Sequence, residues 1–291
     1  CKKIRTDLPT SISLKKVLCL VYSYSGNREQ LEAIAETWGP KCDGYMVASD
    51  ETDPSIGAVN LPYEGNESYG NMWNKLRAMY KYVYTNYLDD FDFFHFGGDD
   101  QYVIAENLIY TVSTGNGKGP WNQSAPLFLG SPRALKGHSL MCLGGPGYTL
   151  NRVALKLLVE ELIDTPACRP HYRAPQEDRF ISSCFAQVDV QCMDTNDEQG
   201  EARYHYADIE RHSNWTNGIS HKKGWKYGGP LARAHKELPK LFGIEWKEGL
   251  GQISKRSVSF HLRRLAKRMR RYHGLLYGLC PGSSSKSNAT N

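Results

Sequence analysis

The sequence lacks any long hydrophobic run, since the longest, Val17 to Tyr22, has only six residues. A helix that crosses a bilayer needs about 20 apolar residues, so the sequence contains no candidate transmembrane span. Its composition is otherwise that of a packed protein, because 40% of the 291 residues are hydrophobic and 11% are aromatic. This composition excludes disorder over most of the chain, and the length suits one large domain or two small ones.

Acidic residues are absent after Glu248, although nine Lys or Arg lie there, from Lys255 to Lys286. The rest of the chain carries 27 basic and 31 acidic residues, so the net charge of +5 comes from the C-terminal segment alone. Proteins that bind nucleic acid spread positive charge over a working face. The distribution therefore excludes nucleic acid as the partner of the main domain.

Within residues 262–291 the sequence predicts a basic amphipathic helix followed by a flexible tail rich in Gly, Ser and Asn. The apolar positions of this helix recur at helical spacing, at Leu262, Leu265, Met269 and Tyr272. Such a helix docks on the acidic remainder of the chain or on an anionic partner, or it is a solvated charged helix. The sequence leaves these alternatives open.

The eight cysteines include no Cys-x-x-Cys pair, so a structural zinc site is not indicated. Two pairs that flank periodic segments predict disulfides, Cys19 with Cys42 and Cys168 with Cys184. Four glycosylation acceptor sites are present, at Asn66, Asn122, Asn214 and Asn288. Both signals favour an oxidising, luminal or extracellular compartment. The chain begins at Cys1 without a signal-like segment, so we expect a truncated ectodomain with any membrane anchor upstream.

Short β-rich segments alternate with segments of helical periodicity. Strands are expected at 17–24, 45–48, 91–96, 127–129, 139–143 and 258–261, and helices up to Trp38 and at 69–87, 152–163 and 176–185, with Asn151 as the cap of the third. The alternation indicates an α/β fold built on a mainly parallel sheet. Residues up to about 114 are typical of a nucleotide-binding α/β unit, and the second half has shorter elements.

Gly98-Asp99-Asp100 follows one of these strands directly. Acidic residues at the carboxyl end of a parallel strand lie in the crevice where α/β sheets bind ligands, and carboxylate oxygens suit Mg²⁺ or Mn²⁺ held against a diphosphate. The alternative is a plain turn, because Gly and Asp favour turns by themselves. A strand that ends in His261 would supply a second ligand only if it meets Asp100 in space.

Two further motifs bear on chemistry. Gln176-Glu177-Asp178 lies at the start of a helix. One of its carboxylates would act as a general base if it faces a pocket. The alternative is structural, because acidic residues stabilise the first turn of a helix. The segment Leu143 to Tyr148 has three glycines, Gly144, Gly145 and Gly147, which let the backbone approach a ligand closely. It matches neither a Walker loop nor a dinucleotide fingerprint, so it is otherwise a loop.

The order of these features resembles the beta-1,3-galactosyltransferases that build core 1 O-glycans, within the inverting beta-1,3-glycosyltransferases that include the Fringe enzymes. The resemblance runs from about Val17 to His261 and is strongest over Tyr82 to Val103. It depends on seven motifs in order, namely Cys19, Thr37-Trp38, the Trp73 helix, Gly-Asp-Asp-x-Tyr-Val, Gly-Gly-x-Gly-Tyr, Glu-Asp and Val-Ser-Phe-His.

The resemblance implies a GT-A fold over residues 17–261, with a nucleotide-sugar-binding half at 17–114 and an acceptor-binding half at 115–261. Residues 1–16 would then be a stem remnant. By position, Asp100 and His261 match ligands of Mn²⁺, and Asp178 matches the catalytic base. The expected contacts to the nucleotide sugar are Asp50, Asp99, Asp100, Gly144 and Gly145. Both predicted disulfides match cysteine pairs of the family.

The implied reaction is inverting, metal-dependent transfer of galactose from UDP-galactose to the 3-hydroxyl of an acceptor sugar, N-acetylgalactosamine O-linked to a glycoprotein. The implied setting is the Golgi lumen, as the ectodomain of a type II membrane protein, and a homodimer is left open. Gly98 replaces the first acid of the family's acidic triple, which leaves a different UDP-sugar open. It also leaves open a non-catalytic relative that acts as a folding helper or binds glycans. A glycosidase would instead need paired catalytic carboxylates and no nucleotide site.

Acceptor identity depends on the stretch Asn214 to Gly251, which does not align well with the family. Its aromatic residues are platforms for sugar rings or members of the core: Trp215, Trp225, Tyr227 and Trp246.

Overall fold

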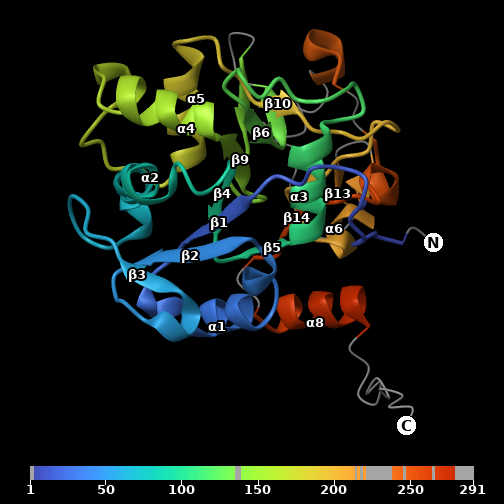
Figure 1. The fold of residues 1–291 in the computed structure, drawn as a ribbon, viewed down its shortest axis with the longest axis horizontal. Coiled ribbons are helices and arrows are strands. Elements are labelled where there is room, and N and C mark those ends of the chain that lie inside the picture. Colours follow the sequence, from blue (N-terminus) through green and yellow to red (C-terminus); the bar gives the residue numbers. More distant parts are fainter. Residues whose placement is uncertain are drawn as a thin grey trace.

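The fold is mixed α/β, with a central seven-stranded sheet flanked by helices (Figure 1). It was obtained as a computed structural model that describes residues 3–134, 139–213, 215–216, 219–220, 238–244, 247–263 and 266–278. Along the sheet the order is β10-β6-β9-β4-β1-β2-β3. The strands span Met193–Asp194, Phe128–Gly130, Tyr148–Asn151, Phe93–Gly98, Val17–Tyr22, Gly44–Ser49 and Ala58–Asn60, in that order.

Most of this sheet is parallel, as the sequence predicts. The pairs β4-β1, β1-β2, β2-β3 and β10-β6 are parallel, and β9 runs antiparallel to both of its neighbours. Since β1 and β4 are adjacent and parallel, the segments that follow Tyr22 and Gly98 emerge at the same edge. A seven-stranded, mostly parallel sheet covered by helices is consistent with a GT-A-like fold.

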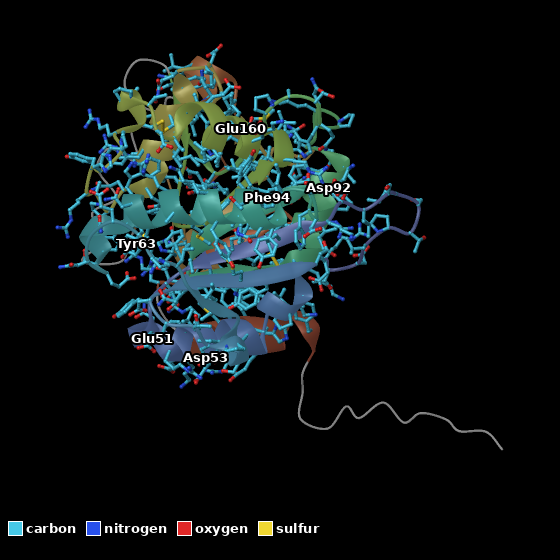
Figure 2. All side chains as sticks on the ribbon, turned by 60° about the vertical axis from the view of Figure 1, so that its left-hand side comes forward. Glu51, Asp53, Tyr63, Asp92, Phe94 and Glu160 are labelled. Atoms are coloured by element: carbon cyan, nitrogen blue, oxygen red, sulfur yellow. A yellow bond between two sulfur atoms is a disulfide. The ribbon has the colours of Figure 1, made fainter. Side chains whose placement is uncertain are left out.

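Helices cover both faces of the sheet because its strands are apolar on both sides. In β1, Leu18 and Leu20 pack into one core cluster, and Val17, Cys19 and Val21 pack into the other. The first cluster lies under α2 (Met72–Tyr87), α4 (Arg152–Leu157) and α5 (Glu177–Ala186). The second lies under α1 (Arg28–Glu36), α3 (Ala105–Thr114) and α8 (Ala266–Tyr277). Figure 2 shows Phe94, which is fully buried, in the interior, and Glu51, Asp53 and Glu160 at the periphery.

A second, three-stranded sheet connects the C-terminal part of the chain to the end of β4. Its strands are β11 (Tyr204–His205), β14 (Ser259–His261) and β5 (Gln101–Val103). Strand β14 pairs antiparallel with β5 so that His261 lies opposite Gln101. The amide of Leu262 also donates a 2.7 Å hydrogen bond to the carbonyl of Asp100. The register therefore brings His261 to the acidic turn.

A buried polar chain links the two sheets behind that turn. His95 on β4 bonds Thr149 Oγ1 through Nδ1 at 2.9 Å and Gln101 Oε1 through Nε2 at 3.2 Å. Thr149 Oγ1 in turn lies 2.9 Å from the hydroxyl of Tyr204 on β11. Burial lowers the pKa of His95 to about 4, so this imidazole is neutral near pH 7. Buried hydrogen bonds of this kind fix the relative position of the elements that they join.

The remaining elements are short. Strands β7 and β8 (Pro132–Ala134 and Leu140–Cys142) form a hairpin, β12 and β13 (Trp215–Thr216 and Ile219–Ser220) form another, and α6 spans Ile209–Ser213. The predicted cap of α4 is confirmed, because the side chain of Asn151 accepts a hydrogen bond from the amide of Ala154. The helix expected to reach Ile163 is α-helical only to Leu157. A π-helical turn, Leu158–Leu162, follows it directly. In the described part of the chain no helix is long and apolar enough to span a membrane.

Three disulfides are present. Cys19 joins Cys42 and Cys168 joins Cys184, which are the two pairs predicted from the sequence. The third joins Cys142 on β8 to Cys192, 50 residues further along the chain. The sequence did not predict this bridge, because neither cysteine flanks a local periodic segment and only the packing of β8 beside the segment before β10 brings them together.

The basic C-terminal helix docks on the acidic remainder of the chain, one of the alternatives that the sequence left open. Figure 1 shows α8 lying along α1. Met269 is fully buried, Arg270 bonds Glu36 at 2.7 Å, and Arg268 forms an ion pair with Asp208. At the other end of the chain, Arg5 donates a 2.8 Å backbone bond to Lys255. The predicted tail, residues 279–291, lies outside the described residues.

Because α8 buries Met269 against the second core cluster, Met269→Ala should destabilise the whole domain. Removal of a fully buried Met side chain costs about 2–5 kcal/mol. We expect the free energy of unfolding, measured by urea denaturation, to fall by that amount. The neighbouring exposed residue offers a matched control, since Lys267→Ala should change stability by less than about 0.5 kcal/mol. Equal, small effects of both substitutions would mean that α8 is not part of the cooperative unit.

Candidate active site

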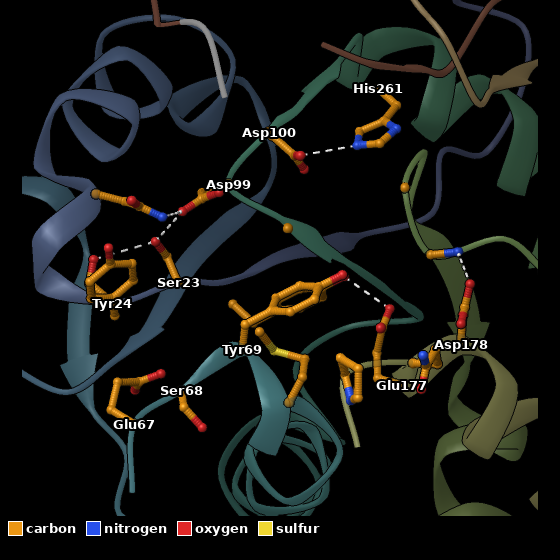
Figure 3. A pocket seen from close by; sticks show the side chains of 18 of the residues that line it. Ser23, Tyr24, Glu67, Ser68, Tyr69, Asp99, Asp100, Glu177, Asp178 and His261 are labelled. Atoms are coloured by element: carbon orange, nitrogen blue, oxygen red, sulfur yellow. Dashed lines mark hydrogen bonds and ion pairs between the residues drawn. The ribbon is translucent and has the colours of Figure 1, made fainter. Parts of the chain in front are cut away.

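A cavity of about 530 Å³ opens at the edge of the sheet where β1 and β4 end. Its lining comes from the segments after β1 and β4, from the turn before α2, from the glycine loop, from the start of α5 and from β14. Figure 3 shows Asp99, Asp100 and His261 on one side of the cavity and Glu177 and Asp178 on another. Of the candidate site residues, those that line it are Asp99, Asp100, Gly144, Gly145, Asp178 and His261.

Asp100 and His261, predicted as a pair from separate motifs, meet at the cavity wall. The Oδ2 atom of Asp100 lies 3.0 Å from Nε2 of His261, and both side chains remain partly accessible. The other ring nitrogen, Nδ1, lies 3.2 Å from the carbonyl of Tyr206, which orients the imidazole. A carboxylate oxygen and an imidazole nitrogen, both possible metal ligands, thus lie next to each other at the cavity wall.

Asp99 has a different environment although it is the next residue along the chain. Its Oδ2 atom accepts hydrogen bonds from Ser23 Oγ and Asn27 Nδ2, each at 2.5 Å. Both donors lie in the segment after β1, and the ammonium of Lys75 bonds the carbonyl of Ser23 and Glu67 Oε2. Asp99 therefore fastens the segments after β1 and β4 to each other beside the cavity.

Glu177 and Asp178 lie side by side at the start of α5 and differ in their partners. Glu177 is buried and accepts a 2.9 Å hydrogen bond from the hydroxyl of Tyr22. Burial, and next the charge of Asp178, raises the pKa of Glu177 from 4.5 to about 8. Burial also raises the pKa of Asp178, opposed by the amides of Gly144 and Arg179, which donate to its two oxygens at 3.0 and 2.8 Å. Of the two, Glu177 therefore retains its proton near neutral pH, whereas the two backbone amides favour the ionised form of Asp178.

Glycine is required in this loop because two side chains pack directly against its backbone. A Cβ atom at Gly144 would lie 2.3 Å from Oε1 of Glu177, and one at Gly145 would lie 2.7 Å from Nδ1 of His261. Any larger residue would displace one of the two groups. The loop thus contacts both halves of the site, and the amide of Gly144 donates a hydrogen bond to Asp178.

Asp50, expected at the nucleotide sugar, does not line the cavity among the described residues. Its carboxylate accepts bonds from the amide of Ser25 at 2.6 Å and from the hydroxyl of Ser49 at 3.1 Å. Asp50 therefore shapes the turn that precedes α1, and the adjacent Glu51 is exposed at the periphery.

Other candidate residues are distributed over the surface or lie outside the described part. The glycosylation sites Asn66 and Asn122 are exposed. Asn214, Asn288, Trp225, Tyr227 and Trp246 lie outside the described residues, as does the side chain of Trp215.

The Asp100–His261 pair fits a divalent cation that binds together with a phosphorylated ligand. Among the described residues no three His, Cys, Asp or Glu side chains gather as metal ligands. Two protein donors leave most coordination positions to water and phosphate oxygens, which is how Mg²⁺ and Mn²⁺ bind in nucleotide sites. The donor set is therefore suited to a metal that arrives with its nucleotide.

Sequence reasoning missed the floor of the cavity. Tyr22, Ser23 and Asn27 come from the segment around the end of β1, and Glu67 and Tyr69 come from the turn before α2. A signal was available for the first group, because the segments after adjacent parallel strands meet at one edge. No local pattern singles out Glu67 or Tyr69, which reach the cavity only through the packing of α2.

The raised pKa of Glu177 predicts how stability depends on pH. Between about pH 4.5 and pH 8 the unfolded chain has an ionised Glu177 and the folded chain a protonated one, so stability falls as pH rises through this range. Glu177→Gln removes this penalty and keeps an acceptor for Tyr22. The melting temperature of the variant, minus that of the unsubstituted protein, should therefore increase by several degrees from pH 5 to pH 8.5. A difference that stays constant with pH would show that Glu177 is ionised in the folded state.

No model of a known protein family matches the chain. A comparison with curated proteins finds similarity to glycoprotein-N-acetylgalactosamine 3-beta-galactosyltransferase 1 of Xenopus laevis, which is 27% identical over 202 residues. The match covers 68% of this chain and 52% of that protein, so the chain spans about half the length of the curated relative. The chain is thus a distant relative of the glycoprotein-N-acetylgalactosamine 3-beta-galactosyltransferases.

Proposed function

We propose that this chain is an inverting, metal-dependent glycosyltransferase that moves galactose from UDP-galactose to the 3-hydroxyl of an acceptor sugar. The proposed acceptor is N-acetylgalactosamine O-linked to a glycoprotein. The observation that carries the proposal is the sharing of one cavity by a carboxylate suited to act as base and a pair of metal-ligand side chains, Asp178 and Asp100–His261. The name of the Xenopus relative supports the same reaction class.

In this proposal Asp178 takes the proton from the acceptor hydroxyl as that oxygen attacks the anomeric carbon. A base must be ionised and within hydrogen-bond reach of the hydroxyl. The amides of Gly144 and Arg179 stabilise the ionised form of Asp178, and burial raises its pKa, which strengthens it as a base. Protonated Glu177 adds no second charge beside it.

Asp100 and His261 are proposed to hold Mn²⁺, which when bound supplies positive charge next to the leaving diphosphate. Asp99 is proposed to act on the nucleotide sugar indirectly, because Ser23 and Asn27 occupy one of its oxygens. Gly144 and Gly145 are proposed to let the donor approach the backbone closely. Asp50 is proposed to support the donor site through the turn at Ser25.

Gly98 favours a second candidate function, that of a non-catalytic relative that binds glycans or assists folding. A Cβ atom at this position would lie 3.2 Å from Asp100 Oδ1 and 3.3 Å from the ring of Tyr22. Gly98 lines the cavity and has no side chain, so the cavity lacks one negative charge that the resemblance implies. Retention of Asp100, Asp178 and His261 in one cavity favours the enzyme, with galactose or another UDP-sugar as donor.

The proposed compartment is the lumen of the Golgi. Three disulfides, Cys19–Cys42, Cys142–Cys192 and Cys168–Cys184, are typical of proteins of oxidising compartments. The exposed acceptor sites Asn66 and Asn122 suit the same environment. A membrane anchor upstream of the chain is part of this proposal.

The assignment of Asp178 is tested by Asp178→Asn, which keeps the shape and one of the two acceptor oxygens but removes the basic carboxylate. Transfer of galactose from UDP-galactose to an N-acetylgalactosamine glycopeptide should fall about 10²–10⁴-fold, while binding of UDP with Mn²⁺ persists. Product formation and calorimetric binding would be measured on the same preparations. Full activity of the variant would contradict the assignment, and absence of transfer by the unsubstituted protein from any UDP-sugar would favour the non-catalytic alternative.

The metal site is tested by Asp100→Ala and His261→Ala, each of which deletes one proposed ligand. Mn²⁺-dependent binding of UDP should weaken at least about tenfold in both variants. Asp178→Asn is the matched control, because it changes a cavity carboxylate outside the proposed ligand pair. If Mn²⁺ strengthens UDP binding as much in Asp100→Ala and His261→Ala as in Asp178→Asn, the pair does not hold the metal.

A further inference from the structure

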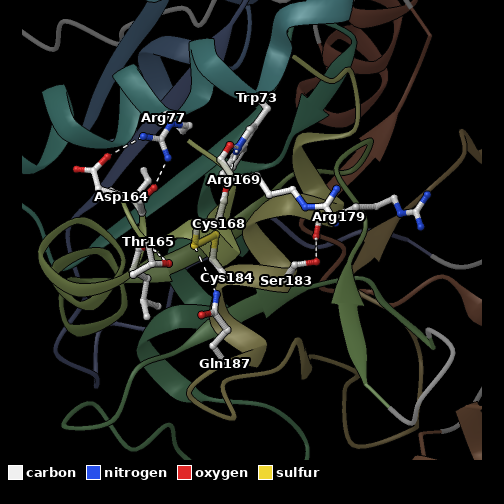
Figure 4. The surroundings of a disulfide bond; sticks show 12 residues. Trp73, Arg77, Asp164, Thr165, Cys168, Arg169, Arg179, Ser183, Cys184 and Gln187 are labelled. Atoms are coloured by element: carbon white, nitrogen blue, oxygen red, sulfur yellow. Dashed lines mark hydrogen bonds and ion pairs between the residues drawn. A yellow bond between two sulfur atoms is a disulfide. The ribbon is translucent and has the colours of Figure 1, made fainter. Parts of the chain in front are cut away.

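A rigid loop of residues 169–176 leads from the Cys168–Cys184 disulfide to the candidate base. Trp73 fixes both of its ends, because its Nε1 donates to the carbonyl of Cys168 at 3.1 Å and its amide donates to the carbonyl of Ala174 at 3.0 Å. The disulfide ties the start of the loop to α5 (Figure 4). These contacts therefore anchor both ends of the loop to α2 and α5.

Two residues of this loop adopt left-handed backbone conformations that are unfavourable for side chains other than glycine. The φ angle is +49° at Arg169 and +70° at His171. Such conformations persist only where the surroundings enforce them, and they are frequent at functional sites. Along this loop Arg169, His171, Tyr172 and Arg173 are all exposed.

The loop and the first turn of α5 carry three exposed arginines, Arg169, Arg173 and Arg179. None of them forms an ion pair with another described residue, whereas the nearby His171 pairs with Glu64 at 2.5 Å. The Arg169 guanidinium lies over the ring of Tyr172, 5.5 Å from its centroid, which holds it in place. Figure 4 shows the side chains of Arg169 and Arg179 extending toward the same side.

Two of these arginines are close in the chain to residues that line the cavity, since Arg173 is two residues before Pro175 and Arg179 directly follows Asp178. The end of the loop, Pro175 and Gln176, and the following Asp178 line the cavity directly. Two exposed aromatic rings lie in the neighbouring segments, with Tyr69 at 67% exposure and Tyr172 at 49%. An acceptor whose hydroxyl reaches Asp178 must therefore place its flanking groups near positive charge.

We infer that Arg169, Arg173 and Arg179 form a subsite for carboxylates of the acceptor, and specifically for acidic residues that flank the glycosylated position of a glycopeptide. The inference deepens the proposed function and rests on it. Unpaired guanidinium groups bind carboxylates by charge-assisted hydrogen bonds. The candidate base itself is negative and would repel an acidic sugar bonded directly to it, so the carboxylates belong on the peptide, away from the reacting sugar.

The test compares transfer to three glycopeptides that differ only in flanking residues: acidic, neutral and basic. For the unsubstituted protein, kcat/KM should be highest for the acidic peptide, and the preference should shrink as salt is raised. In Arg169→Gln/Arg173→Gln, kcat/KM for the acidic peptide should fall about 3- to 10-fold with little change for the neutral one. Arg173→Gln alone should show part of this loss. This variant leaves the two left-handed residues, Arg169 and His171, unchanged.

Lys267→Gln/Arg271→Gln removes the same charge from exposed positions on α8 and should leave the acidic preference unchanged. Equal use of acidic and neutral peptides by the unsubstituted protein, or equal losses on both in the loop variant, would overturn the inference. If no UDP-sugar supports transfer, the proposed function fails first. Direct binding of the three labelled glycopeptides, measured by fluorescence anisotropy, then decides the subsite separately.

Discussion

The pairing of β14 with β5 is the contact on which the candidate site depends. Residues 259–261 come from the far end of the chain, and their register against residues 101–103 puts His261 3.0 Å from Asp100. The same register is supported from behind by the buried network of His95, Thr149 and Tyr204, in which a neutral imidazole connects the two sheets. A shift of one residue would turn His261 to the other face of the small sheet and separate the pair.

Two carboxylates that are neighbours in sequence acquire different properties through their surroundings. Glu177 is enclosed with the hydroxyl of Tyr22 and retains a proton, whereas Asp178 receives two backbone amides that favour its charge. The glycine loop makes this division possible because it lies against Glu177 on one side and His261 on the other. Asp178 and the Asp100–His261 pair are therefore connected through a segment that has no side chain at Gly144 or Gly145.

The segment between Cys168 and α5, which leads to Asp178, depends on a different constraint, its anchoring to α2 and α5. Trp73 and the disulfide hold this segment in a conformation that includes two left-handed residues, Arg169 and His171. Rigid presentation of charge costs little ordering entropy on binding, so it is suited to discriminating between acceptors. In the proposed function the site thus combines a catalytic part, positioned by strand register, with a recognition part, anchored by contacts to α2 and α5.

The sequence by itself determined the fold class, the main helices and strands, and two disulfides, because apolar periodicity and cysteines that flank local segments are encoded over short distances. Local motifs marked the segments that contain Asp100, Asp178 and His261, and the resemblance to the glycosyltransferases singled out these three residues within them. Only the tertiary structure decided the Cys142–Cys192 bridge, the docking of α8 on α1, and the position of Asp50 at the turn of Ser25 instead of in the cavity lining. Each of these depends on contacts between distant segments, whose geometry is set by sheet register and core packing and leaves no local pattern in the chain.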